Sequence, residues 1–281
     1  MKFLLSLLIA SLALGLSPVS KAEDAAPWYQ VEVIVFAQQD LYHTEKHRKD
    51  LKLAYPGNWR VLKNSSIGQQ QEQQQSTPTG EPAEGMETAY ISLGERDFKL
   101  GSDGYALKRA PGYRVMLHQA WRQQGLDADQ SPWVIVAGGE AYGDHSELEG
   151  SVRVVLNRYL HFQANLWHTR FGAPAPSAST TFSSQEGSTL QPMDINAEES
   201  WPTLPKQPWK NDTAPDSDSA GDFGTQQTVP AWSYESPVYG IEDMVALNQT
   251  TRLQLGELTY LDHPNMGVLV LVTRYQPSET P

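Results

Sequence analysis

The chain contains no cysteine among its 281 residues. This absence excludes disulfide bridges, zinc sites built from thiolates and cysteine nucleophiles. It also excludes attachment to a membrane through an acylated cysteine. The fold must therefore rest on a hydrophobic core, and the chain is long enough to form one large domain or two small ones.

Basic residues are scarce relative to acidic ones. The chain carries 21 lysines and arginines against 33 aspartates and glutamates, which gives a formal net charge of −12. No basic tract offsets this excess. Because a nucleic-acid backbone is itself anionic, nucleic acid is not an expected partner.

Long apolar runs are confined to the N-terminus. Lys2 precedes an apolar run from Phe3 to Leu16, Pro18 interrupts any helix, and Ser20-Lys21-Ala22 fits a small-x-small cleavage pattern. A membrane span needs about 20 apolar residues, and this run is shorter. Residues 1–22 are therefore predicted to be a cleaved secretory signal peptide. We expect a mature periplasmic protein, residues 23–281, without a membrane span.

Apolar segments alternate with polar ones along the mature chain. Three segments are predicted to be ordered, at about 28–62, 89–171 and 238–276. Two are predicted to be disordered insertions, at about 64–88 and 172–237, because they have few residues that can enter a core. The second insertion contains Trp201 and Trp209, so parts of it can dock on the core surface. We expect a single domain.

A period of two dominates the ordered segments, which indicates β-strands. Strands are predicted at Tyr29–Phe36, Tyr113–Trp121 and Trp133–Ala137. The longest signal, Gly150–His168, would extend about 60 Å as one strand, so a bend or bulge is expected near Arg158. The chain closes with a hairpin over 251–275, in which Gly256 is interpreted as a bulge.

Helix signals are weaker. A thin apolar face runs through Gln39–Leu53, and a short helix is predicted around Asp97–Leu100. The combination predicts an α+β fold, with a single domain around a largely antiparallel β-sheet and few helices.

Motifs of known catalytic sites are missing. The chain lacks G-x-S-x-G and both glycine-rich phosphate loops. His43 and His47 have a spacing that can hold a metal, but the glutamate of a zincin motif is absent, so a polar surface helix is favoured. His161, Asp262 and His263 are better explained by a wet strand face and turn chemistry than by a catalytic triad. Glu147 and Glu149 are interpreted as solvated loop charges. We predict no catalytic residue, metal or cofactor.

One face of the longest strand signal is the candidate binding site. Its polar side chains offer donors and acceptors for sugar hydroxyls and peptide amides, and its aromatic rings can stack on a sugar. Two other interpretations remain open: a merely solvated sheet face, or a face covered by a helix. Alternation assigns Arg158 to the same face as the apolar residues of this segment. We therefore expect that it either pairs with an acid such as Glu257 or points outward. The candidate ligand-binding residues are Arg153, Asn157, Tyr159, His161, Gln163 and Asn165.

Four blocks of this sequence carry a resemblance: residues 28–36 (WYQVEVIVF), 113–123 (YRVMLHQAWRQ), 150–167 (GSVRVVLNRYLHFQANLW) and 256–264 (GELTYLDHP) with Gly267. Together they resemble the blocks of the CsiV family of periplasmic proteins. The chain departs from the family pattern at Thr259, where histidine is expected, and at Thr250-Thr251-Arg252, where paired arginines are usual.

The resemblance implies a non-enzymatic protein that binds peptidoglycan and supports the machinery of wall assembly and cell shape. Peptidoglycan and wall-synthesis envelope proteins are therefore the expected partners. Two alternatives stay open. One is an envelope protein–protein adaptor without glycan contact, and the other is a wall hydrolase that uses converging carboxylates.

Overall fold

A computed structural model describes residues 26–38, 47–69, 89–174, 200–210 and 239–277. The predicted signal peptide and most of both predicted insertions lie outside these residues.

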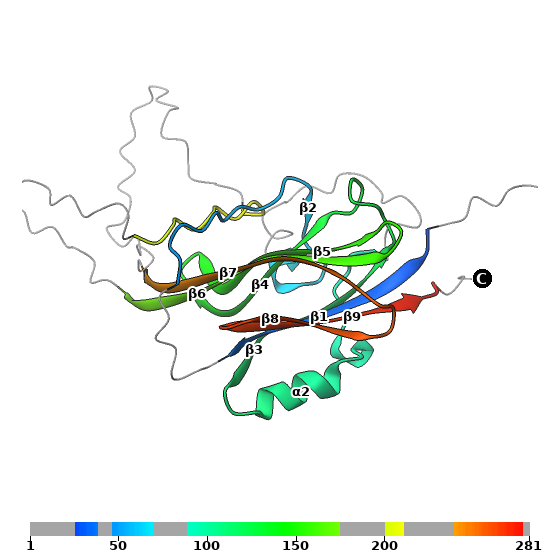
Figure 1. The fold of residues 1–281 in the computed structure, drawn as a ribbon, viewed down its shortest axis with the longest axis horizontal. Helices are drawn as coiled ribbons and strands as arrows, with labels where there is room; N and C mark the ends of the chain where they lie inside the picture. Colours follow the sequence, from blue (N-terminus) through cyan, green and yellow to red (C-terminus); the bar gives the residue numbers. More distant parts are fainter. Residues whose placement is uncertain (1–25, 39–46, 70–88, 175–199, 211–238, 278–281) are drawn as a thin grey trace, which may run out of the picture.

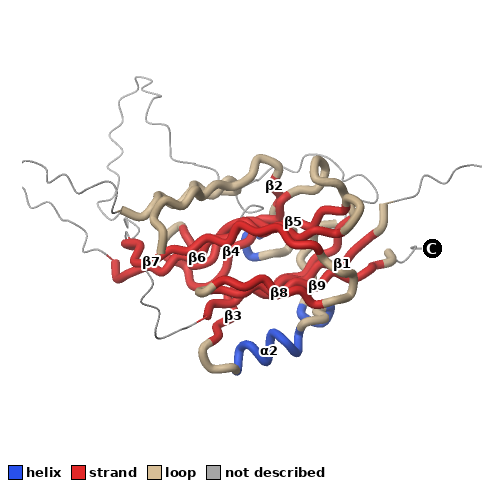
Figure 2. The backbone as a smooth tube through the Cα atoms, viewed as in Figure 1, coloured by secondary structure: helices blue, strands red, loops and turns tan. Residues whose placement is uncertain are grey.

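The described strands form two sheets that stack face to face (Figures 1 and 2). Sheet A has the order β3-β1-β9-β8, and sheet B has the order β2-β4-β5-β6-β7. Neighbouring strands are antiparallel except in the short β2–β4 pair. The strands of sheet A are β1 (Trp28–Gln38), β3 (Tyr113–Gln124), β8 (Leu258–His263) and β9 (Met266–Tyr275). Those of sheet B are β2 (Trp59–Arg60), β4 (Trp133–Tyr142), β5 (His145–Leu156), β6 (Leu160–Pro174) and β7 (Tyr239–Arg252).

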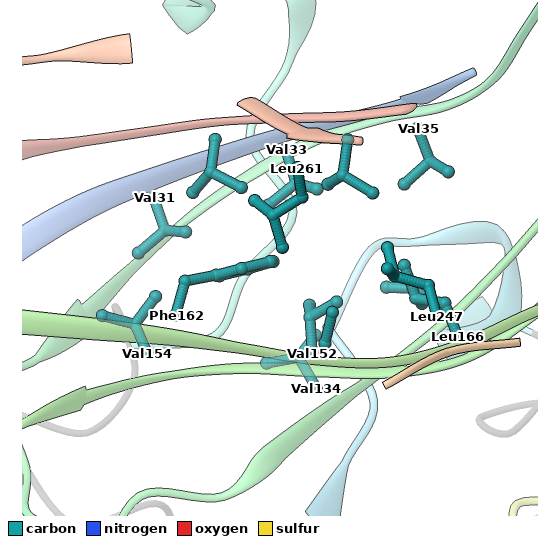
Figure 3. Packing of buried hydrophobic residues seen from close by; sticks show 14 of the residues in the cluster. Val31, Val33, Val35, Val134, Val152, Val154, Phe162, Leu166, Leu247 and Leu261 are labelled. Atoms are coloured by element: carbon teal, nitrogen blue, oxygen red, sulfur yellow. The ribbon is translucent and has the colours of Figure 1, made fainter. Parts of the chain in front are cut away.

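The α+β prediction, with largely antiparallel strands and few helices, is confirmed. The strands are divided between two sheets rather than placed in one. Each sheet presents one apolar face to the other, because alternate side chains of a strand point to opposite faces. Figure 3 shows the result: Val31, Val33 and Val35 of β1 lie opposite Val152 and Phe162 of sheet B.

The outer face of sheet A is partly covered by helix α2 (Gly101–Arg109), which follows the 3-10 turn η1 (Glu95–Asp97). Glu32 lies beneath the start of this helix and is 1% exposed. Its carboxylate accepts hydrogen bonds from the backbone N–H groups of Lys99 (2.7 Å) and Leu100 (3.0 Å). Nε2 of His118 on β3 donates a third, at 2.7 Å. One buried acid therefore joins β1, β3 and the N-terminal end of α2.

The longest strand signal, Gly150–His168, is two strands rather than one bent strand. The chain reverses at Asn157, Arg158 and Tyr159, and Leu156 pairs with Leu160 across the hairpin. Because this turn has an odd number of residues, Val154 and Phe162 still point into the same interior. The apolar parity was correct, but the connection was not a bend or a bulge.

Three further predictions are corrected. Residues 47–53, the described part of the expected helix over Gln39–Leu53, are not helical. The helix predicted around Asp97–Leu100 begins instead at Gly101. Gly256 is not a strand bulge. It has φ of +80° in the turn that carries the chain from β7 of sheet B to β8 of sheet A, a conformation that favours glycine.

Within the described residues, no helix has the length and apolar character needed to cross a membrane.

Replacing Glu32 with alanine should lower the free energy of unfolding by about 1–3 kcal/mol, because buried donors lose their acceptor. Burial opposes ionisation of Glu32, but its hydrogen bonds from His118, Lys99 and Leu100 outweigh this and lower its pKa below 4.5. Its contribution should therefore be complete above about pH 4.5 and be lost as pH falls through the lowered pKa.

Urea unfolding of the wild type and of Glu32→Gln across the acid range measures this contribution. The variant should lose less stability than the wild type between neutral and acid pH. Equal losses would contradict the assignment of Glu32 as the group responsible.

Candidate functional site

The β5–β6 hairpin carries all six residues predicted to bind ligand. The structure divides them into two groups. Arg153, Gln163 and Asn165 lie on the outer face of sheet B, whereas the other three residues lie at or beside the hairpin tip. The tip residues are Asn157, Tyr159 and His161.

The first group is engaged within the protein. Arg153 donates through Nε to Oε1 of Gln163 and through Nη1 to the carbonyl of Ala128, at 2.9 Å. Its guanidinium also lies 4.5 Å from the centre of the Trp133 ring. Asn165 donates to the carbonyl of Ala54 at 2.9 Å. These side chains hold neighbouring segments on the sheet.

Two loop segments cover part of this outer face, residues 47–58 and residues 200–210 (Figure 1, blue and yellow). The Tyr55 ring packs edge-on against Trp167 of β6 (4.9 Å between centroids) and against Trp209 (5.3 Å). Trp167 and Trp209 are 0% and 3% exposed. Residues 200–210 lie inside the stretch expected to be disordered, and their tryptophans dock on the sheet. The cover is two loops rather than the helix considered as an alternative.

Glu149 fixes these covering loops. It is 0% exposed and accepts hydrogen bonds from Nε2 of Gln207, the N–H of Ser146 (3.0 Å) and the Tyr55 hydroxyl (3.4 Å). Nδ1 of His145 lies 3.1 Å from it. Burial, together with this carboxylate, raises the pKa of Tyr55.

Glu147 is also buried, and its carboxylate forms a two-point pair with Arg114 at 2.7 and 2.9 Å. This pair joins β5 to β3 and therefore joins the two sheets. The interpretation of Glu147 and Glu149 as solvated loop charges was wrong, because both carboxylates lie in β5 and have partners within the fold.

The hairpin tip is exposed. Tyr159 is 39% exposed, and the Arg252 guanidinium lies 3.5 Å from the centre of its ring. Arg158 lies 5.5 Å from the same ring. Nδ1 of His161 donates to the Tyr159 carbonyl at 3.0 Å. Of the two possibilities for Arg158, the structure has the outward one.

A third cation, Arg274, lies at the same end of the sandwich, 5.7 Å from the Tyr29 ring. Strand β1 begins here, and β7 and β9 end here (right of Figure 1). Gly125 packs against both Tyr29 and Leu156. We call Arg158, Tyr159, Arg252 and Arg274 the arginine end. Across the described part of the chain, none of these three arginines forms an ion pair with a carboxylate.

The sequence-based list missed Arg252 and Arg274. Arg252 pairs with His161 across β6 and β7, a register visible only once the hairpin is recognised. Neither belongs to the strand whose parity was analysed, so that parity carries no signal for them.

The residues considered for a catalytic triad are not brought together. His161 lies at the arginine end on sheet B. Asp262 and His263 lie on sheet A, at the far end of β8. Among the described residues, no group of acids and histidines is arranged to hold a metal ion. His47 instead contacts Asp243 at 2.7 Å, and His43 lies outside the described residues.

A family model described as "Peptidoglycan-binding protein, CsiV" matches residues 2–275. The chain belongs to the CsiV family. The resemblance of the four sequence blocks is thereby confirmed, and the family description connects the chain with peptidoglycan and the cell envelope. No curated protein and no solved structure matches it.

Replacing Glu149 with alanine should release residues 200–210 from sheet B, because Gln207 and Tyr55 lose their buried acceptor. We expect a loss of about 1–3 kcal/mol in unfolding free energy. Tryptophan emission should shift to longer wavelength as Trp209 becomes hydrated, and proteolysis within 200–210 should accelerate. Glu140→Ala, at an exposed acid on β4, is the control and should leave both readouts unchanged. Unchanged emission in the Glu149 variant would contradict this role.

Proposed function

We propose that this protein is a non-enzymatic periplasmic protein that binds peptidoglycan and supports wall assembly and cell shape. The arginine end, with Asn157 and His161 beside it, contacts the carboxylates of the wall's stem peptides. The family match supports peptidoglycan as the ligand, and the geometry of the hairpin tip supports the place of contact.

The observation that carries this proposal is the unpaired charge. Acidic residues outnumber basic ones in the chain, yet within the described residues three arginines at one end have no carboxylate partner. Their guanidinium groups lie beside aromatic rings, and within the described residues no side-chain hydrogen bond of these three groups is present. A guanidinium fork matches a carboxylate in two-point geometry, so an anionic peptide is the ligand chemistry that suits this surface.

The tip is organised before a ligand arrives. Tyr159 fixes the position of Arg252, and the bond from His161 to the Tyr159 carbonyl fixes the turn. Asn157 adds an exposed amide that can both donate and accept. Of the six residues predicted from sequence, we therefore propose Asn157, Tyr159 and His161 as direct contacts. Arg153, Gln163 and Asn165 are proposed as supports of the hairpin.

Replacing Arg158, Arg252 and Arg274 together with alanine should reduce sedimentation of the protein with purified sacculi at least tenfold. The reason is that the carboxylates of the wall lose their charged donors. Sedimentation of the wild type should also fall as ionic strength rises, because exposed charge pairs are screened by salt.

A matched control removes three exposed cations elsewhere, as Arg48→Ala, Lys108→Ala and Arg170→Ala in one chain. It makes the same change in net charge and should sediment like the wild type. Equal losses in the two triple variants would show that net charge, not the arginine end, controls binding. Wild-type protein that stays wholly in the supernatant would rule out direct wall binding and favour the adaptor alternative.

A further inference from the structure

A second exposed surface lies on the outer face of sheet A, at the end opposite the arginine end. Tyr113 of β3 and Tyr260 of β8 are 43% and 49% exposed, and Leu258 of β8 is 48% exposed. Leu258, Tyr260 and Asp262 alternate along β8 and share its outer face. Leu261, between Tyr260 and Asp262, points into the core. Helix α2 covers the neighbouring part of this face and leaves these side chains in solvent.

The aromatic rings here are held in a fixed arrangement. Tyr260 lies parallel to Phe36 of β1, with 6.3 Å between centroids and 8° between planes. Tyr113 also packs edge-on against the Phe36 ring, with 5.5 Å between centroids. Phe36 is only 4% exposed, so it acts as the buried support for two exposed rings.

Gly267 on β9 makes this arrangement possible. A Cβ atom at this position would collide with Cζ of Phe36. The Phe36 ring therefore lies directly over the backbone of β9 and reaches Tyr260 on the next strand. Any larger residue at 267 would displace the support of the platform.

Polar groups border the rings. The Tyr260 hydroxyl donates to Oδ1 of Asp262, and Nε2 of Gln38 donates to the Tyr260 oxygen at 3.1 Å. Hydrogen bonds from Tyr260 and Gln38 hold the pKa of Asp262 below its usual range, so this carboxylate stays ionised. The Asp262 carboxylate also accepts a hydrogen bond from the backbone N–H of His263. Its remaining lone pairs and the amide oxygen of Gln38 can accept hydrogen bonds from a ligand.

We propose that Tyr113, Tyr260, Gln38 and Asp262 form a subsite for an uncharged polysaccharide, the β-1,4-linked N-acetylated sugar strand of peptidoglycan. A pyranose ring presents C–H groups on one face, which stack on exposed aromatic rings, and hydroxyls at its rim. Those hydroxyls donate to a carboxylate and an amide oxygen. Leu258 offers an apolar contact for an acetyl methyl group.

The ligand proposed here is uncharged, whereas the ligand proposed for the arginine end is anionic. The subsite contains an ionised Asp262, which would repel the carboxylate of a stem peptide. An uncharged sugar meets no such repulsion. The inference rests on the proposed function, and it assigns glycan and peptide to different surfaces of the protein.

The test uses the protein purified after export and a tetramer of β-1,4-linked N-acetylglucosamine, which carries no peptide. Titration calorimetry should show binding by the wild type. Tyr260→Ala and Asp262→Ala should each weaken it at least tenfold. Asp262→Asn, which preserves the shape of the side chain, should also weaken binding and guards against a folding defect. Tyr105→Ala, at an exposed tyrosine on helix α2, is the matched control and should bind like the wild type.

Each outcome decides a separate point. Wild-type protein that sediments with sacculi but does not bind the tetramer would overturn the glycan subsite and leave the proposed function standing. Equal affinity in the Tyr260 and Tyr105 variants would overturn the assigned location. The triple arginine variant should still bind the tetramer, and its failure to do so would overturn the separation of glycan from peptide. Wild-type protein that binds neither sacculi nor the tetramer would overturn the proposed function itself.

Discussion

The whole structure depends on two sheets sharing one apolar interior. Every strand that lines this interior must keep its apolar residues on one parity, from Val31 in β1 to Val272 in β9. The alternate residues, which point to the outer faces, can then differ between the two sheets. On each sheet these outward-facing residues include a buried glutamate, Glu32 or Glu149, which accepts several hydrogen bonds and fastens a covering segment to the strands. A buried charge is stable there because its acceptor capacity is satisfied by donors fixed in the fold.

Coverage of the outer faces decides where a ligand can be held. Helix α2 covers part of sheet A, and residues 47–58 and 200–210 cover part of sheet B. Two groups of side chains that remain exposed lie at opposite ends of the sandwich. One set combines arginines with Tyr159, and the other combines a carboxylate with Tyr113 and Tyr260. Under the proposed function, their opposite charge suits different chemical parts of one polymer.

Strand parity was readable from the sequence because it is local. Val31, Val33 and Val35 alternate with Glu32 and Ile34, and the structure keeps that alternation. Connections were less readable, because a reversal at Arg158 and a continuous strand give the same apolar pattern when the turn has an odd number of residues. The candidate site was predicted only in part for a related reason. Asn165 and Arg153 are engaged by loops distant in sequence, and Arg252 reaches Tyr159 only through pairing of β6 with β7. Such long-range contacts leave no periodic signal.

If the arginine end contacts the wall as proposed, its three exposed arginines also influence the direction from which the molecule approaches. Three cations are concentrated there, while the chain as a whole carries a net charge of −12. An anionic network produces a field that acts on such a distribution with a torque as well as a force. Such a torque would favour encounters in which the arginine end faces the network.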